Sequence, residues 1–139
     1  MSSEQNKALA SRLVEEVLNQ GNIRVIDEIT SPDFVENEAL PPGIPPGREA
    51  PKALFSMLFN GFPDFHATIE HLIAEGDTVV LHMTWTGTQQ GEFMGIPPTG
   101  RRISVNVIDI IRIANGKLAE HWGIMDNATM MQQLGVMPE

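Results

Sequence analysis

The stretch VIDIIRIANGKLAEHWGIMD, residues 107–126, predicts two apolar strands joined by the Asn-Gly turn at 115–116. Asn-Gly suits a two-residue type I′ turn, because both central residues of that turn need a positive φ. Counting outward from the turn pairs Asp109 with Trp122 and places Asp126 on the same face as Asp109, since side chains alternate along a strand. A carboxylate on an apolar face must be hydrogen-bonded, ion-paired or protonated. The hairpin therefore presents two candidate acid–base residues.

This register divides the hairpin into two faces. The more apolar face is expected to line a pocket and comprises Val105, Val107, Asp109, Ile111, Leu118, Glu120, Trp122, Ile124 and Asp126. The opposite face comprises Ser104, Asn106, Ile108, Ile110, Arg112, Ala119, His121, Gly123 and Met125. His121 is therefore expected to point away from the pocket.

The spacing of the two acids limits what they can do together. Val105, which faces Asp126, lies four residues from Asp109, so the carboxylates are expected about 13 Å apart at about 3.3 Å per residue. That distance is too long for them to share one proton. Structural roles stay open for both, with Asp126 as the N-cap of a last helix and Asp109 paired with an Arg.

Helices come first in the remaining chain and antiparallel strands later, which is the order of an α+β domain. Helical periodicity, caps and glycine stops predict helices over residues 4–20, 22–29, 48–60 and 127–134. Period-two patterns predict strands over 65–74, 78–88, 103–113 and 117–125. The Pro/Gly-containing segments 36–47 and 88–102 are expected to be loops, and residues 1–139 a single domain.

Composition excludes several classes of partner. The chain carries a formal net charge of −9, and its only adjacent basic pair is Arg101-Arg102. Nucleic acid and anionic membranes are therefore not expected partners, because both need clustered positive charge. No apolar run reaches the roughly 18–20 residues of a membrane span, and the first residues lack signal-peptide order, so a cytoplasmic location is expected. The absence of Cys excludes thiolate catalysis and Cys-ligated metals.

Other candidate residues have two readings each. The four His residues lack H-x-H or H-E-x-x-H spacing, so no metal site is expected. Trp85 and Trp122 fit either the core or a flat wall for an aromatic ligand. Met94 and Ile96 lie in the 88–102 loop and fit either an apolar lid or ordinary loop anchoring.

Several segments together resemble one known family. GEFMGIPPTGRRI at 91–103, RIANGKLAEHW at 112–122 and an Asp six residues before QQLG resemble the SnoaL-like polyketide cyclases, within the nuclear transport factor 2-like superfamily. PPGIPPGREAPKALF at 41–55 resembles the same family. The resemblance implies a cone-shaped α+β barrel, in which a curved antiparallel sheet and N-terminal helices enclose a pocket.

The resemblance also implies a chemistry. Members of the family close the last ring of an aromatic polyketide by intramolecular aldol condensation, without a metal or organic cofactor. Their acid–base Asp near the end of the last strand corresponds to Asp126, and a polar pocket residue of the family falls near Asn37. One position departs from the family, because Asp109 stands where the cyclases have His. A carboxyl there can donate a hydrogen bond only if it is protonated.

The sequence therefore predicts an enzyme that uses carboxylate acid–base chemistry next to a carbonyl, with Asp126 moving the proton and Asp109 orienting the substrate. Asn37, Trp85, Trp122, Met94 and Ile96 are the expected substrate-binding residues. The expected ligand is a hydrophobic or aromatic small molecule, and a homodimer or higher homo-oligomer is expected through the outer sheet face. Isomerase, epoxide hydrolase or dehydratase chemistry, or non-catalytic binding of a hydrophobic ligand, are the alternatives on the same scaffold.

Overall fold

The computed structural model describes residues 2–136 and has the expected α+β order. Its helical elements are α1 (Ser3–Arg12), the π-helical segment η1 (Leu13–Leu18), α2 (Val25–Ile29), α3 (Glu49–Gly61) and α4 (Asn127–Leu134). Its strands are β1 (Thr30–Glu36), β2 (His66–Glu75), β3 (Thr78–Thr88), β4 (Arg102–Ala114) and β5 (Lys117–Met125). No helix in the described part of the chain is long and apolar enough to cross a membrane.

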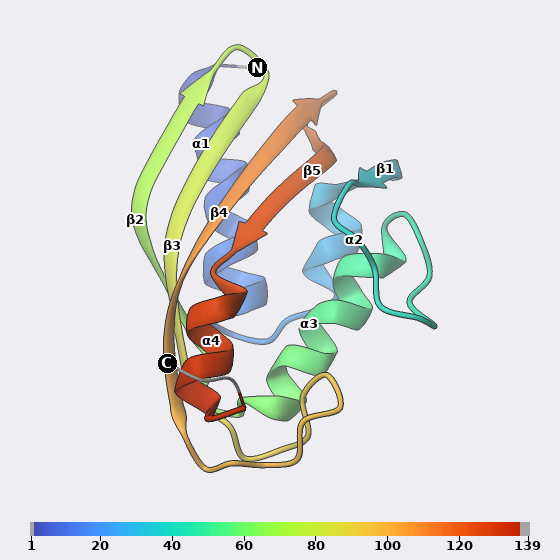
Figure 1. Ribbon diagram of the computed structural model, residues 1–139. Coiled ribbons are helices and arrows are strands. Elements are labelled where there is room, and N and C mark those ends of the chain that lie inside the picture. Colours follow the sequence, from blue (N-terminus) through green and yellow to red (C-terminus); the bar gives the residue numbers. More distant parts are fainter. Residues whose placement is uncertain (1, 137–139) are drawn as a thin grey trace.

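The strands form one curved sheet in the order β1-β5-β4-β3-β2, as Figure 1 shows. The pairs from β2 to β5 are antiparallel, as predicted. The fifth strand, β1, was not predicted, and it adds a parallel pair with β5 at the edge of this antiparallel sheet. The sequence pattern missed β1, whose run is interrupted by Pro32, and proline is tolerated only because this strand lies at an edge. The sheet stays open between β1 and β2.

The helices cover one face of this sheet, and the core lies between the two layers (Figure 1). Alternate residues of β3 are buried along its whole length, and they share one hydrophobic core with Val14 and Val17 of η1, which are fully buried. The opposite sheet face is open to solvent at Ile108 and Ile110. Because only one face of the sheet is buried, apolar and polar residues alternate along the strands, and this alternation allowed the strands to be predicted from the sequence.

Two local sequence signals are confirmed. Asn115 and Gly116 have φ values of 53° and 73°, as a type I′ turn requires. Ser2 caps α1 in a capping box, in which its hydroxyl accepts from the Gln5 N–H at 3.1 Å and the Gln5 side chain accepts from the Ser2 N–H at 2.9 Å. Both features depend only on contacts within a few residues, so they do not depend on the tertiary structure.

The closing hairpin contains a β-bulge that the sequence register did not include. Ile113 pairs with Leu118, but the next pair along the strands is Arg112 with Glu120. Ala119 is therefore an extra residue in β5. Leu118 and Ala119 are both buried although they are adjacent, which a regular strand does not allow.

The bulge exchanges the two faces of β5 beyond Ala119. Asp109 pairs with Gly123, not with Trp122 as predicted. A shift of one residue moves every later side chain to the opposite face. His121, Gly123 and Met125 consequently face inward and line the pocket, whereas Trp122 is 40% exposed on the outer face. The predicted inward direction of Trp122 and outward direction of His121 and Met125 are both wrong for this reason.

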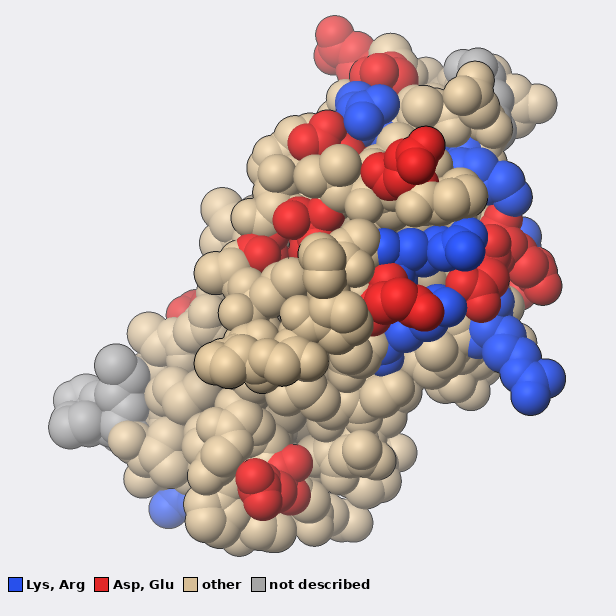
Figure 2. Space-filling model, turned by 90° about the vertical axis from the view of Figure 1, so that its right-hand side faces the viewer, with Lys and Arg blue, Asp and Glu red and all other residues tan. Residues whose placement is uncertain are grey.

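Charged side chains are mixed over the face drawn in Figure 2. Lys and Arg lie among Asp and Glu there, and Lys52 contacts the carboxylates of Asp27 and Glu49 at 2.6 and 2.8 Å. Such mixed charge on this face is unlike the basic surface that nucleic-acid binding requires.

The outer face of β4 and β5 is the expected site of self-association, because four large apolar side chains are exposed on it: Ile108, Ile110, Trp122 and Ile124. We expect wild-type protein at micromolar concentration to scatter light with twice the mass of one chain, and Ile108→Glu to halve that mass. Val136→Glu, which changes an equally apolar residue that is 51% exposed elsewhere, serves as the control. A monomeric wild-type protein would contradict the expectation.

Candidate active site

A pocket of about 530 Å³ opens between the concave face of the sheet, α3 and α4. Its lining is mainly apolar and includes five methionines: Met57, Met94, Met125, Met130 and Met131. Its polar lining residues are Thr30, Glu36, Glu38, Asp109, His121 and Asn127. Among the residues described, no Lys or Arg lines this pocket. An apolar cavity with a few convergent polar groups is the usual form of a small-molecule site.

The centre of the polar group is the imidazole of His121, which lies between two carboxylates. Its Nε2 is 2.8 Å from Oδ1 of Asp109, and its Nδ1 is 2.6 Å from Oε2 of Glu36. The three residues come from neighbouring strands, with Glu36 at the end of β1, Asp109 in β4 and His121 in β5. Asp109 is only 7% exposed. The buried Asp between two isoleucines is thus compensated by a histidine, not by the arginine considered from the sequence.

The two carboxylates decide the charge of His121. Burial alone lowers the pKa of the imidazole, but the hydrogen bonds and negative charges of Asp109 and Glu36 outweigh burial and raise the pKa to about 10. At neutral pH the ring therefore carries a proton on both nitrogens, so that each N–H donates to one carboxylate. Asp109 is accordingly the anionic partner of an imidazolium.

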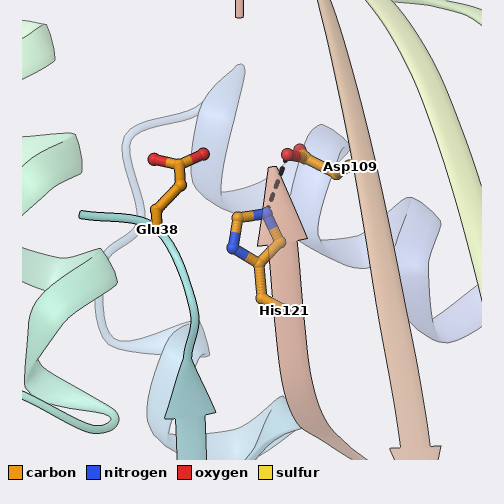
Figure 3. A group of neighbouring side chains, drawn as sticks. All are labelled: Glu38, Asp109 and His121. Carbon is orange, nitrogen blue, oxygen red and sulfur yellow. Dashed lines mark hydrogen bonds and ion pairs between the residues drawn. The ribbon is translucent and has the colours of Figure 1, made fainter. Parts of the chain in front are cut away.

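A third carboxylate, that of Glu38, points toward the same point from the segment after β1, as Figure 3 shows. Burial raises the pKa of the Glu38 carboxyl, and the charges of Glu36 and Asp109 raise it further against the opposing charge of His121. Sequence reasoning missed Glu36, Glu38 and His121. The E-x-E spacing places both glutamates on one side of an extended segment, but this signal is too common to have identified them.

Gly123 leaves the space into which these side chains converge. A Cβ at this position would overlap the Glu38 carboxylate and would lie 2.8 Å from Cε1 of His121 and 3.0 Å from Oδ1 of Asp109. A glycine inside a strand often marks a close approach of this kind. The sequence contained that signal, but its meaning depended on the bulge at Ala119.

Asp126 does not share this pocket. It is exposed, and it forms the N-cap of α4, with its carboxylate accepting from N and Oγ1 of Thr129 at 3.1 and 2.6 Å. These hydrogen bonds lower the pKa of the Asp126 carboxyl. The geometric expectation that Asp126 shares the pocket face with Asp109 is wrong, because β5 ends at Met125 and the chain turns into the helix. The capping alternative is the one that the structure shows.

The other expected substrate-binding residues divide between pocket and surface. Trp85 and Met94 line the pocket. Asn37 does not, because its amide points outward to Glu120 and to the His121 carbonyl, so the polar pocket residues are its two neighbours in sequence. Ile96 instead anchors the 88–102 loop, and its carbonyl accepts from the buried Gln89 amide at 3.0 Å.

The crowding at Gly123 predicts that a single methyl group disrupts the site. In Gly123→Ala we expect the fold to persist, because Glu38 ends in a flexible chain, but His121 and Asp109 to move apart. A shift of this size lowers activity by at least about tenfold. The His121 imidazole resonances in an NMR spectrum report the displacement directly, and unchanged resonances in a folded variant would contradict the crowding.

The capping role of Asp126 predicts a graded effect on stability. Asp126→Ala removes both acceptors and should lower the free energy of unfolding by about 1 kcal/mol. Asp126→Asn keeps a capping oxygen and should cost at most a few tenths of that amount. Urea denaturation measures both values, and equal losses for the two variants would argue against the cap.

Comparison with known proteins identifies the family to which this fold and sequence correspond. The family model described as SnoaL-like polyketide cyclase matches residues 8–134. The nogalonic acid methyl ester cyclase of Streptomyces nogalater is 30% identical over 119 residues, which cover 84% of this chain and 88% of that protein. The aklanonic acid methyl ester cyclase DnrD of Streptomyces peucetius is 30% identical over 131 residues, with 88% of each protein covered.

A solved structure agrees over nearly the whole chain. TsrD from Streptomyces laurentii superposes with a TM-score of 0.89 at 31% identity, and the match covers 99% of both chains. The fold, the family model and the related sequences all lead to one assignment. The chain belongs to the SnoaL-like polyketide cyclase family, as its sequence motifs indicated.

Proposed function

We propose that this protein catalyses an intramolecular aldol condensation of a polyketide-type substrate, with Asp109 as the base and His121 as the acid. The observation that carries the proposal is the Asp109–His121 ion pair, with its 2.8 Å contact, at the wall of an apolar pocket. The family relatives named above are cyclases of nogalonic and aklanonic acid methyl esters. Asp109, which the sequence assigned to orientation, takes the proton-abstracting role that was first given to Asp126.

The proposed reaction begins with proton abstraction. Asp109 uses one carboxylate oxygen to accept the Nε2–H of His121, so its second oxygen is available to remove a proton from the carbon next to a substrate carbonyl. The electron pair of that C–H bond forms an enolate. An apolar surrounding favours this step, because it does not hydrate the carboxylate.

Ring closure then follows within one molecule. The enolate carbon attacks a second carbonyl carbon of the same substrate, which forms the C–C bond and leaves an alkoxide. The Nε2–H of His121 protonates that alkoxide. The protonated Asp109 carboxyl then turns its O–H toward the neutral Nε2, which lies 2.8 Å from its other oxygen, and returns the proton, which restores the starting ion pair. Holding a flexible substrate in the reactive geometry supplies much of the rate.

Glu36 acts as a positioning residue in this scheme. Its side chain is only 4% exposed and holds Nδ1 of His121 at 2.6 Å. That contact fixes which ring nitrogen faces the pocket, and it stabilises the positive charge of the acid. The arrangement resembles the orientation of a catalytic histidine by a buried carboxylate in other enzymes.

Trp85, Met94 and the other apolar lining residues would hold the body of the substrate. Trp85 packs edge-on against Phe65, with 5.2 Å between ring centroids, so its ring is fixed in the pocket wall. A rigid aromatic wall beside flexible methionines suits a flat hydrophobic ligand.

The carboxylate assignment predicts opposite outcomes for two matched variants. With nogalonic acid methyl ester as the probe, Asp109→Asn should lower kcat/KM by at least about 10²-fold, the usual contribution of a general base. Asp126→Asn should stay within about twofold of the wild type. Chromatographic separation of the open and cyclised isomers gives the rates.

If Asp126→Asn lowered kcat/KM and Asp109→Asn did not, the base would be Asp126 and not Asp109. Wild-type protein that binds the ester without cyclising it would contradict the proposed reaction and favour the non-catalytic binding alternative. Product identity also separates aldol closure from isomerisation or dehydration, since only closure forms a new C–C bond.

A further inference from the structure

Three potential metal ligands converge on the pocket wall. A carboxylate oxygen of Glu38, a carboxylate oxygen of Asp109 and a ring nitrogen of His121 all lie within 4.8 Å of one another. They come from the segment after β1, from β4 and from β5, and Figure 3 shows their side chains pointing toward one another. We propose that Glu38, Asp109 and His121 form a binding site for a single divalent transition-metal ion.

The spacing of the three ligand atoms suits one ion. Metal–ligand distances of about 2.1 Å place neighbouring ligands of an octahedral ion roughly 3 Å apart. Oδ1 of Asp109 and Nε2 of His121 are 2.8 Å apart. Glu38 ends a flexible side chain, so its oxygen can approach the other two without movement of the backbone.

The imidazole is already oriented for coordination, and a metal ion would displace the proton that Nε2 carries at neutral pH. Glu36 accepts the Nδ1–H of His121 at 2.6 Å and its side chain is buried. Metal-bound histidines almost always direct their second nitrogen to a carboxylate in this way, because that contact fixes the ring and strengthens the ligand. Nε2 is thereby the nitrogen that faces Asp109 and Glu38.

Space and charge both leave room for a cation. Gly123 places no side-chain atom where the three groups meet. Three carboxylates, those of Glu36, Glu38 and Asp109, surround a single imidazolium, and no Lys or Arg lines the pocket within the described residues. A divalent ion would balance this excess of negative charge.

The donor set indicates the class of ion. Two carboxylate oxygens and one imidazole nitrogen form a mixed oxygen–nitrogen site, which suits Zn²⁺, Co²⁺, Fe²⁺ or Mn²⁺ better than Mg²⁺. Three protein ligands leave further coordination positions open to the pocket, where water or a substrate oxygen can bind.

The ion would use the same two atoms as the proposed proton transfer. Coordination by Nε2 of His121 and by Asp109 breaks their hydrogen bond, so an occupied site cannot carry out the reaction described above. The metal-bound and the catalytic states therefore exclude each other, and metal binding is tested separately because it is measured without any substrate.

Cobalt titration of the full chain tests the site. We expect chelator-treated wild-type protein to bind one Co²⁺ per chain, with a visible absorption band from the bound ion and heat measurable by calorimetry. Glu38→Gln should weaken binding at least about tenfold without affecting the fold, and His121→Gln should abolish the absorption band. Glu36→Gln, which alters only the orienting contact, should weaken binding about 10- to 100-fold.

Two comparisons separate this site from surface binding. Glu75→Gln removes an exposed carboxylate of β2 and should leave Co²⁺ binding unchanged, and Mg²⁺ should bind at least about tenfold more weakly than Co²⁺. Equal Co²⁺ affinity in wild type and Glu38→Gln, or an absorption band that persists in His121→Gln, would overturn the proposal. Neither result would bear on the aldol reaction, which is measured by turnover.

Discussion

The contacts of His121 with Asp109 and Glu36 join β5 to both of its neighbours in the sheet. Without the imidazolium, the two buried carboxylates on either side of β5 would lack a counter-charge at the pocket wall, which is costly. Without the carboxylates, a buried cation would be left unpaired. The same mutual compensation that allows these charges inside the pocket also places an N–H donor next to a carboxylate.

This arrangement depends on a single extra residue. If β5 were regular, Trp122 would fill the pocket opposite Asp109 and His121 would face solvent. The bulge at Ala119 places His121 and Gly123 inward instead, and Gly123 provides the space that their carboxylate partners need. Bulges next to active sites commonly redirect a side chain in this manner.

The pocket fits membership of the SnoaL-like cyclase family, but family membership does not determine which polar residues line it. The apolar walls, with Trp85 and several methionines, suit a hydrophobic substrate. The polar end is distinctive, because three carboxylates surround one imidazole. The imidazolium of His121 balances part of that charge, and the carboxylates that remain give this end of the pocket its negative character.

Local patterns in the sequence determined the α+β class, the helix caps and the Asn115-Gly116 turn, because each rests on contacts within a few residues. Motifs spread along the chain also indicated the family. The partner of Asp109 could not be read from the sequence, because it depends on the register of β5 beyond Ala119 and on the parallel pairing of β1. These are tertiary facts, since a bulge and an edge strand are set by packing between distant segments, and they line the pocket with His121 and Glu38 and not with Asp126 and Trp122.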